Sequence, residues 1–271
     1  MSSSSTTSER TADLHEALAE IRARVQRATP VSSSSAPTLV AVSKYKPASD
    51  VQACYDVGQR DFGENYVQEL VEKAQQLPSD IRWHFIGTLQ SNKAKTLASI
   101  PNIHTIQTVT STKAATALDR ALPAERTTPL NILLQVNTSG EDAKSGLAPL
   151  APAPEPQQHQ GSELVTLAKH IITTCPRLRL RGLMTIGSLA ESRQLDAENR
   201  DFATLCATRD ALETVLGAEA GVSEEAGGAW GEGGKLLLSM GMSGDFEAAL
   251  RAGSDVVRVG TGIFGERRKK A

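Results

Sequence analysis

Eight short runs of β-forming residues alternate with stretches of helical periodicity along the chain, and this alternation restricts the folds open to it. Apolar strands that alternate with helices are typical of a parallel sheet. Eight of them predict a single closed α/β barrel of the (β/α)8 TIM type. A doubly wound open sheet is the alternative, because a count of strands cannot show closure. The predicted strands are Leu39–Val42, Arg60–Phe62, Arg82–Ile86, Ile103–Ile106, Leu130–Val136, Leu178–Leu183, Leu236–Met240 and Val256–Val259.

An additional helix is predicted before the first strand, over residues 10–28, where Leu14, Leu18, Ile21 and Val25 recur at helical spacing. Only residues 260–271 follow the last strand, too few for a full closing helix. We therefore expect the N-terminal helix to cover the face that an eighth helix would fill. The helices between the strands are predicted at residues 48–58, 66–76, 91–99, 111–121, 162–174, 194–216 and 244–252.

Four polar stretches are interpreted as additions to the barrel, because their composition buries too little apolar surface to offset the entropy of ordering. Residues 1–9 are predicted to be a disordered tail, and residues 29–37 a Ser/Pro linker. The insertion 151–160 is rich in Pro and Gln, and the insertion 217–234 is rich in Gly. Without these stretches about 225 residues remain, which fits one barrel domain over residues 10–271.

The balance of charge excludes some partners. The chain has 29 Lys and Arg against 31 Asp and Glu, a net charge of −2, which argues against a generally basic nucleic-acid binder. The basic run 267–270 is interpreted as a solvated tail. The cysteines Cys54, Cys175 and Cys206 are too scattered to predict a disulfide framework or a metal site. No apolar run approaches the roughly 18 residues of a membrane helix.

The N-terminal residues contain no apolar stretch that could serve as a secretory signal, and Glu9, Asp13, Glu16 and Glu20 are atypical of a mitochondrial leader. We expect a cytoplasmic monomer, with mitochondria as the alternative location.

Lys44 follows the first strand, in LVAVSKYKP. Ligand sites of such barrels lie at the carboxyl ends of the strands. Lys44 shares a strand face with Val40 and Val42, and if that face points inward, desolvation would lower the pKa of its amine. A neutral amine can attack a carbonyl carbon. A solvated Lys at a strand end is the alternative.

The segments after the seventh and eighth strands, SMGMSGDFEAAL and VVRVGTGIFGE, are small and glycine-rich. Such turns expose backbone N–H groups, and barrels often bind phosphate at these two loops. Two ordinary tight turns are the alternative. Ser243 is predicted to cap the helix that follows the seventh strand. Arg258 shares a face with Gly260, and a buried cation there needs an anionic or acceptor partner. Residues 260–265 match G-x-G-x-x-G, but they lack the following helix and acid of a dinucleotide site.

Three other side chains fall at or near the predicted mouth of the barrel. Asn65 can cap the following helix or reach a ligand, His84 is a strand residue of the core, and Lys144 lies in a polar loop. A reactive Lys with a phosphate site suits either pyridoxal phosphate, bound as an internal aldimine, or a Schiff-base aldolase acting on a sugar phosphate. The spacing does not choose between them.

Six segments, AVSKYKP, FGENYVQE, WHFIGTLQSNK, RLRLRGLMTI, LSMGMSGDFEAAL and VRVGTGIFG, resemble those of the pyridoxal phosphate homeostasis proteins in the same order. The resemblance implies a barrel similar to the N-terminal domain of alanine racemase. It also implies a protein that buffers or carries pyridoxal 5′-phosphate (PLP) without established turnover, and apo PLP-dependent enzymes as recipients.

The resemblance also implies roles for individual residues. Lys44 would hold PLP as an aldimine, and Arg258 would face the pyridine nitrogen. Ser243, Gly260 and Thr261 would hold the phosphate. Asn65 and Ser239 match positions near the pocket, and His84 and Lys144 match the family pattern without an assigned contact.

Two enzymes remain as alternatives. An amino-acid racemase of related fold would need a second base from a further domain, and the sequence shows none after the barrel. A class I aldolase would need an acidic partner for its Lys inside the barrel, and no predicted strand offers one. We therefore expect a binding protein rather than an enzyme.

Overall fold

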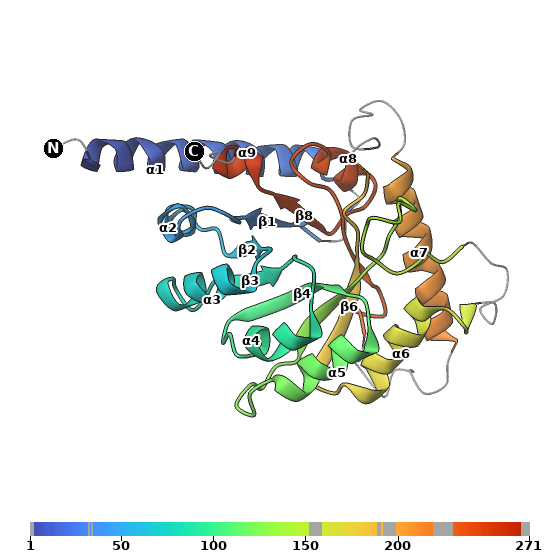
Figure 1. Ribbon diagram of the computed structural model, residues 1–271. Helices are drawn as coiled ribbons and strands as arrows, with labels where there is room; N and C mark the ends of the chain where they lie inside the picture. The colour runs from blue at the N-terminus through green and yellow to red at the C-terminus, as the bar shows by residue number, and fades with distance from the viewer. Residues whose placement is uncertain are drawn as a thin grey trace.

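The strands form a closed barrel in the computed structural model, which describes residues 3–31, 33, 35–151, 159–188, 191, 199–218 and 230–266. Each strand pairs in parallel with the next along the chain, and the eighth pairs with the first (Figure 1). Closure confirms the predicted barrel and excludes the open sheet. The strands are β1 (Thr38–Val42), β2 (Asp61–Glu64), β3 (Arg82–Phe85), β4 (Ile103–Val109), β5 (Leu130–Gln135), β6 (Leu178–Met184), β7 (Leu237–Ser239) and β8 (Val256–Val259).

The helices predicted between the strands are present within a few residues of their expected ends. The helix expected at 194–216 begins at Arg200, and residues 192–198 lie outside the described residues. Serine side chains cap two of them, Ser111 before α5 and Ser162 before α6. Among the described helices, none is both long and apolar enough to cross a membrane. The helices are α1 (Ser3–Ala28), α2 (Ala48–Asp56), α3 (Val67–Gln76), α4 (Ala94–Ala98) after the 3-10 turn η1 (Ser91–Lys93), α5 (Thr112–Ala121), α6 (Glu163–Thr174), α7 (Arg200–Gly217), α8 (Phe246–Arg251) and α9 (Thr261–Phe264).

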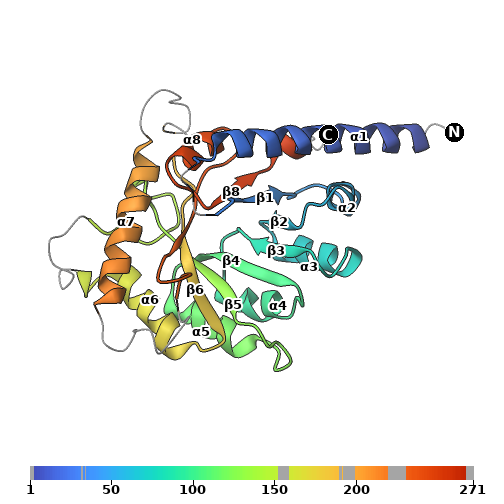
Figure 2. The same ribbon diagram turned by 180° about the vertical axis from the view of Figure 1, so that it is seen from behind.

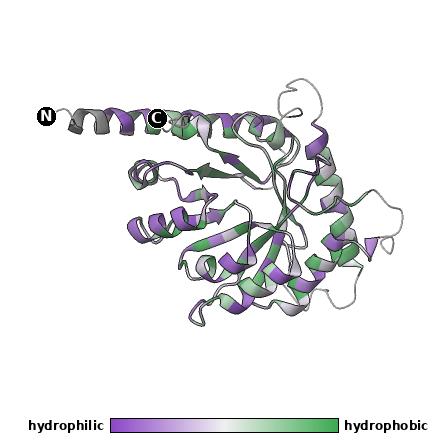
Figure 3. Cartoon of the chain, in the orientation of Figure 1, coloured by the Kyte–Doolittle hydropathy of each residue, from purple (hydrophilic) through white to green (hydrophobic). Residues whose placement is uncertain are grey.

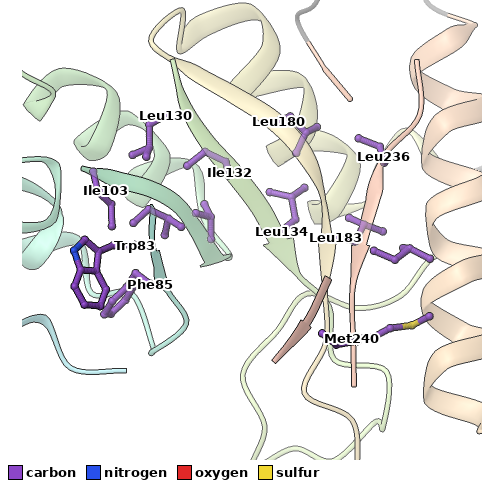
Figure 4. Close-up of a cluster of buried hydrophobic side chains, with 14 of the residues drawn as sticks. Trp83, Phe85, Ile103, Leu130, Ile132, Leu134, Leu180, Leu183, Leu236 and Met240 are labelled. Carbon is purple, nitrogen blue, oxygen red and sulfur yellow. The ribbon is translucent and has the colours of Figure 1, made fainter. Parts of the chain in front are cut away.

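The main apolar core lies between the barrel and its helices. Alternate residues of β3, Trp83 and Phe85, are buried in this cluster (Figure 4). The cluster continues through Ile132 of β5 and Leu180 of β6 (Figure 4). Strand β1 is hydrophobic along its length in Figure 3, whereas α3 is largely hydrophilic. Because side chains alternate along a strand, His84, which lies between Trp83 and Phe85 on β3, faces the inside of the barrel.

Helix α1 covers the face that lacks a full eighth helix. It packs against α2, α8 and α9, and α9 has only four residues (Figures 1 and 2). Leu14, Leu18 and Ile21 are buried in this contact. The packing agrees with the arrangement predicted from the sequence.

The predicted disordered tail is wrong for residues 3–9, because α1 begins at Ser3. Ser and Thr are weaker helix formers than Ala, but only by a few tenths of a kcal/mol per residue. A helix nucleated by its apolar face can therefore extend into such residues, each adding one hydrogen bond. The N-terminal end of α1 projects past α2 and away from the barrel (Figures 1 and 2).

The predicted insertions differ in what the structure shows. Residues 152–158 and 219–229 lie outside the described residues. The end of the second insertion, however, belongs to the barrel wall. Trp230 forms a bridge with Leu180 of β6 and packs against the core. Trp230 is therefore not part of a solvated addition, because it contributes apolar surface to the core, whereas Glu232, Gly233 and Gly234 are exposed.

Replacing Leu18 with Ala should lower the free energy of unfolding by about 2–5 kcal/mol, because a fully buried Leu loses transfer energy and leaves a cavity. The exposed Glu20, one half-turn away, provides the control, and Glu20→Ala should change stability by less than about 0.5 kcal/mol. Denaturant unfolding measures both. An unchanged stability in Leu18→Ala, or an unchanged melting temperature after deletion of residues 1–28, would contradict the proposed closing role of α1.

Candidate functional site

The residues singled out by the sequence gather at one end of the barrel. Parallel strands bring their carboxyl ends to the same side. Lys44 follows β1 and Asn65 follows β2, while Ser239 ends β7. The remaining four lie on or just after β7 and β8: Ser243, Arg258, Gly260 and Thr261.

Lys44 lies in a turn two residues beyond β1 and is half-buried. The next residue, Tyr45, has a φ of 63°, a left-handed value that no other non-glycine residue shows in the described part of the chain. This backbone conformation is strained for a side chain with a Cβ atom and persists only where neighbours hold it. The Tyr45 N–H donates to Glu69 Oε1 at 2.7 Å, and the Lys46 N–H donates to Ser43 O at 3.0 Å.

A buried ion pair supports this turn from below. Lys73 Nζ donates to Glu64 Oε1 at 2.6 Å and to the Ser43 carbonyl oxygen at 2.7 Å. Glu64 also accepts a hydrogen bond from the Ser43 hydroxyl, and it is fully buried. Burial raises the pKa of Glu64, and the positive charge of Lys73 opposes that rise. The pair fixes Ser43, the residue immediately before Lys44.

Sequence reasoning missed Glu64 and Lys73. Lys73 stands four residues after Glu69 on a largely hydrophilic helix, a pattern typical of a solvated pair. Its inward orientation depends on how α3 packs against β2. The sequence held one signal for this pair: Glu64, a charged residue in FGENYVQE, follows closely on a predicted strand.

The side chain of Lys46 is hydrogen-bonded to the end of α9. Its Nζ atom donates to three carbonyl oxygens at the end of α9, those of Phe264, Gly265 and Glu266, at 2.8, 3.0 and 2.9 Å. Lys46 therefore ties the first loop of the barrel to the last helical turn.

Arg258 is buried inside the barrel with 4% of its surface exposed. Its guanidinium donates to Ser239 Oγ at 2.6 Å and to the Thr185 carbonyl oxygen at 2.7 Å. Burial lowers its pKa to about 10, and the nearby Asp245 carboxylate opposes this. The two acceptors, the Ser239 hydroxyl and the Thr185 carbonyl oxygen, are uncharged and do not neutralise the positive charge of Arg258.

The loops after β7 and β8 meet beside Arg258. The Gly260 N–H donates to Ser243 Oγ at 3.1 Å. Asp245, not Ser243, is the residue before α8, so the predicted capping role of Ser243 is wrong. Its hydroxyl links the two loops because β7 and β8 are neighbours in the barrel. Thr261 is exposed at the first position of α9.

Asn65 does not cap α3 either, since Tyr66 occupies that position without a side-chain bond. Its Oδ1 atom is buried and accepts no hydrogen bond from the described residues. Asn65 lines a cavity of about 240 Å³ on the side of the mouth formed by the ends of β3 to β6. Lys144 also lines this cavity, and its Nζ atom donates to Glu141 Oε1 and the Gly187 carbonyl oxygen, both at 2.7 Å.

His84 lies deeper in the barrel, near Asp61 and His104, and donor atoms of these three side chains lie within 4.8 Å of one another. The arrangement is an ion-pair cluster rather than a metal site, because Arg82 donates to Asp61 at 2.9 Å and His84 lies 3.0 Å from the same oxygen. Burial alone would raise the pKa of Asp61, but the bonds from Arg82 and His84 lower it well below its usual range. Burial and the neighbouring His84 lower the pKa of His104 to about 4.

Known proteins are similar to this chain in sequence and in fold. Residues 17–268 match the family model of the alanine racemase N-terminal domain. A pyridoxal phosphate homeostasis protein of Schizosaccharomyces pombe is 40% identical over 94% of this chain and 93% of its own length. The human pyridoxal phosphate homeostasis protein is 41% identical over 85% of this chain and 77% of its own.

Solved structures agree with these matches. PipY of Synechococcus elongatus, solved with PLP bound, is 30% identical, with a TM-score of 0.64 over 93% of this chain and all of that one. The alanine racemase of Corynebacterium glutamicum shares the fold at 14% identity, with a TM-score of 0.63 over 97% of this chain and 63% of the racemase. With the barrel and the motifs at its mouth, these matches establish that the chain belongs to the pyridoxal phosphate homeostasis protein family.

Proposed function

We propose that this protein binds PLP at the mouth of its barrel, with Lys44 as the covalent anchor, and serves to buffer or carry the cofactor in the cell. The observation that carries the proposal is the buried Arg258 guanidinium, held by two uncharged acceptors at the same end of the barrel as Lys44. The names of the curated relatives and the PLP bound to PipY support the choice of ligand.

The residues at the mouth fit PLP in their chemistry. The Ser243 and Thr261 hydroxyls, beside the glycine-rich loop, suit a phosphate group. Gly260 lies close to β1, where an added Cβ atom would be 3.3 Å from the Val42 carbonyl oxygen, so the loop comes near the Lys44 turn. The buried Oδ1 atom of Asn65, which accepts no hydrogen bond from the described residues, could accept one from a ligand. When bound, PLP supplies an aldehyde that reacts with primary amines.

Each residue would then have a distinct task. The Lys44 amine would condense with the aldehyde and release water, and the hydroxyls of Ser243 and Thr261 with the Gly260 loop would hold the phosphate. Arg258 would face the pyridine nitrogen and disfavour its protonation, because a fixed cation opposes a second positive charge nearby. An unprotonated ring withdraws electrons weakly, which suits storage of the cofactor better than turnover. Apo PLP-dependent enzymes of the cytoplasm would receive it.

Titration of the purified protein with PLP tests this function. We expect a visible absorption band to develop with one PLP per chain. We also expect no racemisation of the common L-amino acids at rates of about 1 per second, the lower end for ordinary enzymes. Racemisation at such rates would favour the racemase instead. Trapping of a sugar phosphate by borohydride, without a response to PLP, would favour the aldolase.

A further inference from the structure

A chain of buried polar side chains crosses the inside of the barrel and ends at Arg258. Arg258 Nη1 lies 2.6 Å from Ser239 Oγ, which lies 2.7 Å from Gln107 Oε1. Gln107 Nε2 lies 3.1 Å from His84 Nδ1, and His84 Nε2 lies 3.0 Å from Asp61 Oδ1. We call these five residues the polar chain. All five are buried, with exposures between 0% and 7%.

The polar chain replaces part of the apolar filling that such a barrel usually contains. Gln107 is on β4 and Ser239 is on β7, and these strands are not neighbours in the barrel. Their side chains can meet only through the interior. Burying so many polar groups is costly unless each one is hydrogen-bonded, and here every link is made.

The directions of the hydrogen bonds are set by the atoms that can only donate or only accept. A guanidinium only donates, so Ser239 Oγ accepts from Arg258 and gives its own proton to Gln107 Oε1. The Gln107 amide nitrogen then donates to His84 Nδ1. His84 Nε2 lies beside the Asp61 carboxylate, which can only accept, so this ring nitrogen is the donor of that hydrogen bond.

This order matters for Arg258. Since the Ser239 proton is committed to Gln107, a lone pair of Ser239 Oγ is held toward the guanidinium. If Gln107 were released, the Ser239 hydroxyl could rotate, and Arg258 would keep one fixed acceptor, the Thr185 carbonyl oxygen. His84 holds Gln107 in turn, because its Nδ1 atom accepts from the amide nitrogen.

We propose that the polar chain positions the Arg258 guanidinium from inside the barrel, so that His84 and Gln107 set the affinity for PLP without touching it. They are positioning residues, and the inference rests on the proposed function in that PLP is taken as the ligand of Arg258. Networks of this kind can transmit the loss of one member to the next, since Ser239, Gln107 and His84 are each hydrogen-bonded to a member on either side.

Affinity for PLP, measured by titration of the visible absorbance, provides the test. His84→Leu removes the acceptor for Gln107 and should weaken PLP binding about tenfold, or 1.4 kcal/mol. His84→Asn should restore binding to within about threefold of wild type, because its side-chain oxygen occupies the place of Nδ1. His170 is a matched control, half-buried and bonded to Thr116 Oγ1 on the outer helices, and His170→Leu should leave PLP affinity unchanged.

A double-mutant cycle separates positioning from general destabilisation. Ser239→Ala interrupts the polar chain next to Arg258. The double variant Ser239→Ala, His84→Leu should therefore bind PLP no more than about twofold more weakly than Ser239→Ala alone. Additive losses would contradict transmission through Ser239. If His84→Leu fails to fold, Gln107→Leu takes its place in the same cycle.

The outcomes distinguish this inference from the proposed function. If the His84→Leu variant is less stable but binds PLP as tightly as wild type, the polar chain is structural only and the inference is wrong. If the wild-type protein binds no PLP, the proposed function fails and the inference fails with it.

Discussion

Lys44→Ala should abolish the visible absorption band that PLP develops on the wild-type protein. Alanine has no amine, so no covalent link to the aldehyde can form, and the remaining contacts hold only the phosphate and the ring. Reduction with borohydride should attach one PLP per wild-type chain at Lys44 and none to the variant. Absorbance titration and peptide mass mapping measure the two effects.

Lys46 provides the matched control, two residues away in the same loop. Its Nζ atom already donates to three carbonyl oxygens at the end of α9, which holds the group away from the mouth and engages all three N–H donors of its ammonium form. Lys46→Ala should retain the absorption band and lose some stability. A band that survives Lys44→Ala but disappears in Lys46→Ala would overturn the assignment of the anchor.

Lys73→Met should destabilise the protein by about 3–5 kcal/mol, a large fraction of the stability of an ordinary domain. Lys73 and Glu64 are 4% and 0% exposed, so removing the cation leaves a carboxylate buried without its counter-charge. The Ser43 carbonyl oxygen loses its donor at the same time. Denaturant unfolding measures the loss, and PLP affinity should fall as well because the Lys44 turn loses its support.

Two variants check that explanation. Lys95 is an exposed Lys on α4, and Lys95→Met should change stability by less than about 0.5 kcal/mol. The double variant Lys73→Met, Glu64→Gln should recover part of the lost stability, because it removes the uncompensated charge. A double variant no more stable than Lys73→Met would show that the cost comes from packing and not from the buried carboxylate.

The barrel could be predicted from the sequence because its signals are local. Most strands are short runs of apolar residues, and most helices repeat their apolar residues every three or four positions, so both can be recognised from a few neighbouring residues. The ends of β8 were predicted to the residue. The order of elements then fixed which residues stand at the carboxyl ends, and Lys44 and Arg258 were found in that way.

Other features depended on contacts that the sequence does not encode locally. The capping roles expected of Asn65 and Ser243 were wrong, because α3 and α8 begin later than predicted and Tyr66 and Asp245 occupy the N-cap positions. Ser243 instead receives a hydrogen bond from Gly260, 17 residues away. The helical state of residues 3–9 was missed because composition measures propensity and not the extension of a helix that already exists.

By itself, the sequence determined the class of fold, the order of its elements and the end of the barrel that carries the chemistry, since periodicity and chain order suffice for these. The tertiary structure alone decided the left-handed Tyr45, the Lys73–Glu64 pair beneath it and the polar chain from Asp61 to Arg258. Those features join residues up to 132 positions apart, as between Gln107 and Ser239. Which polar groups meet inside a barrel is fixed only when the barrel closes.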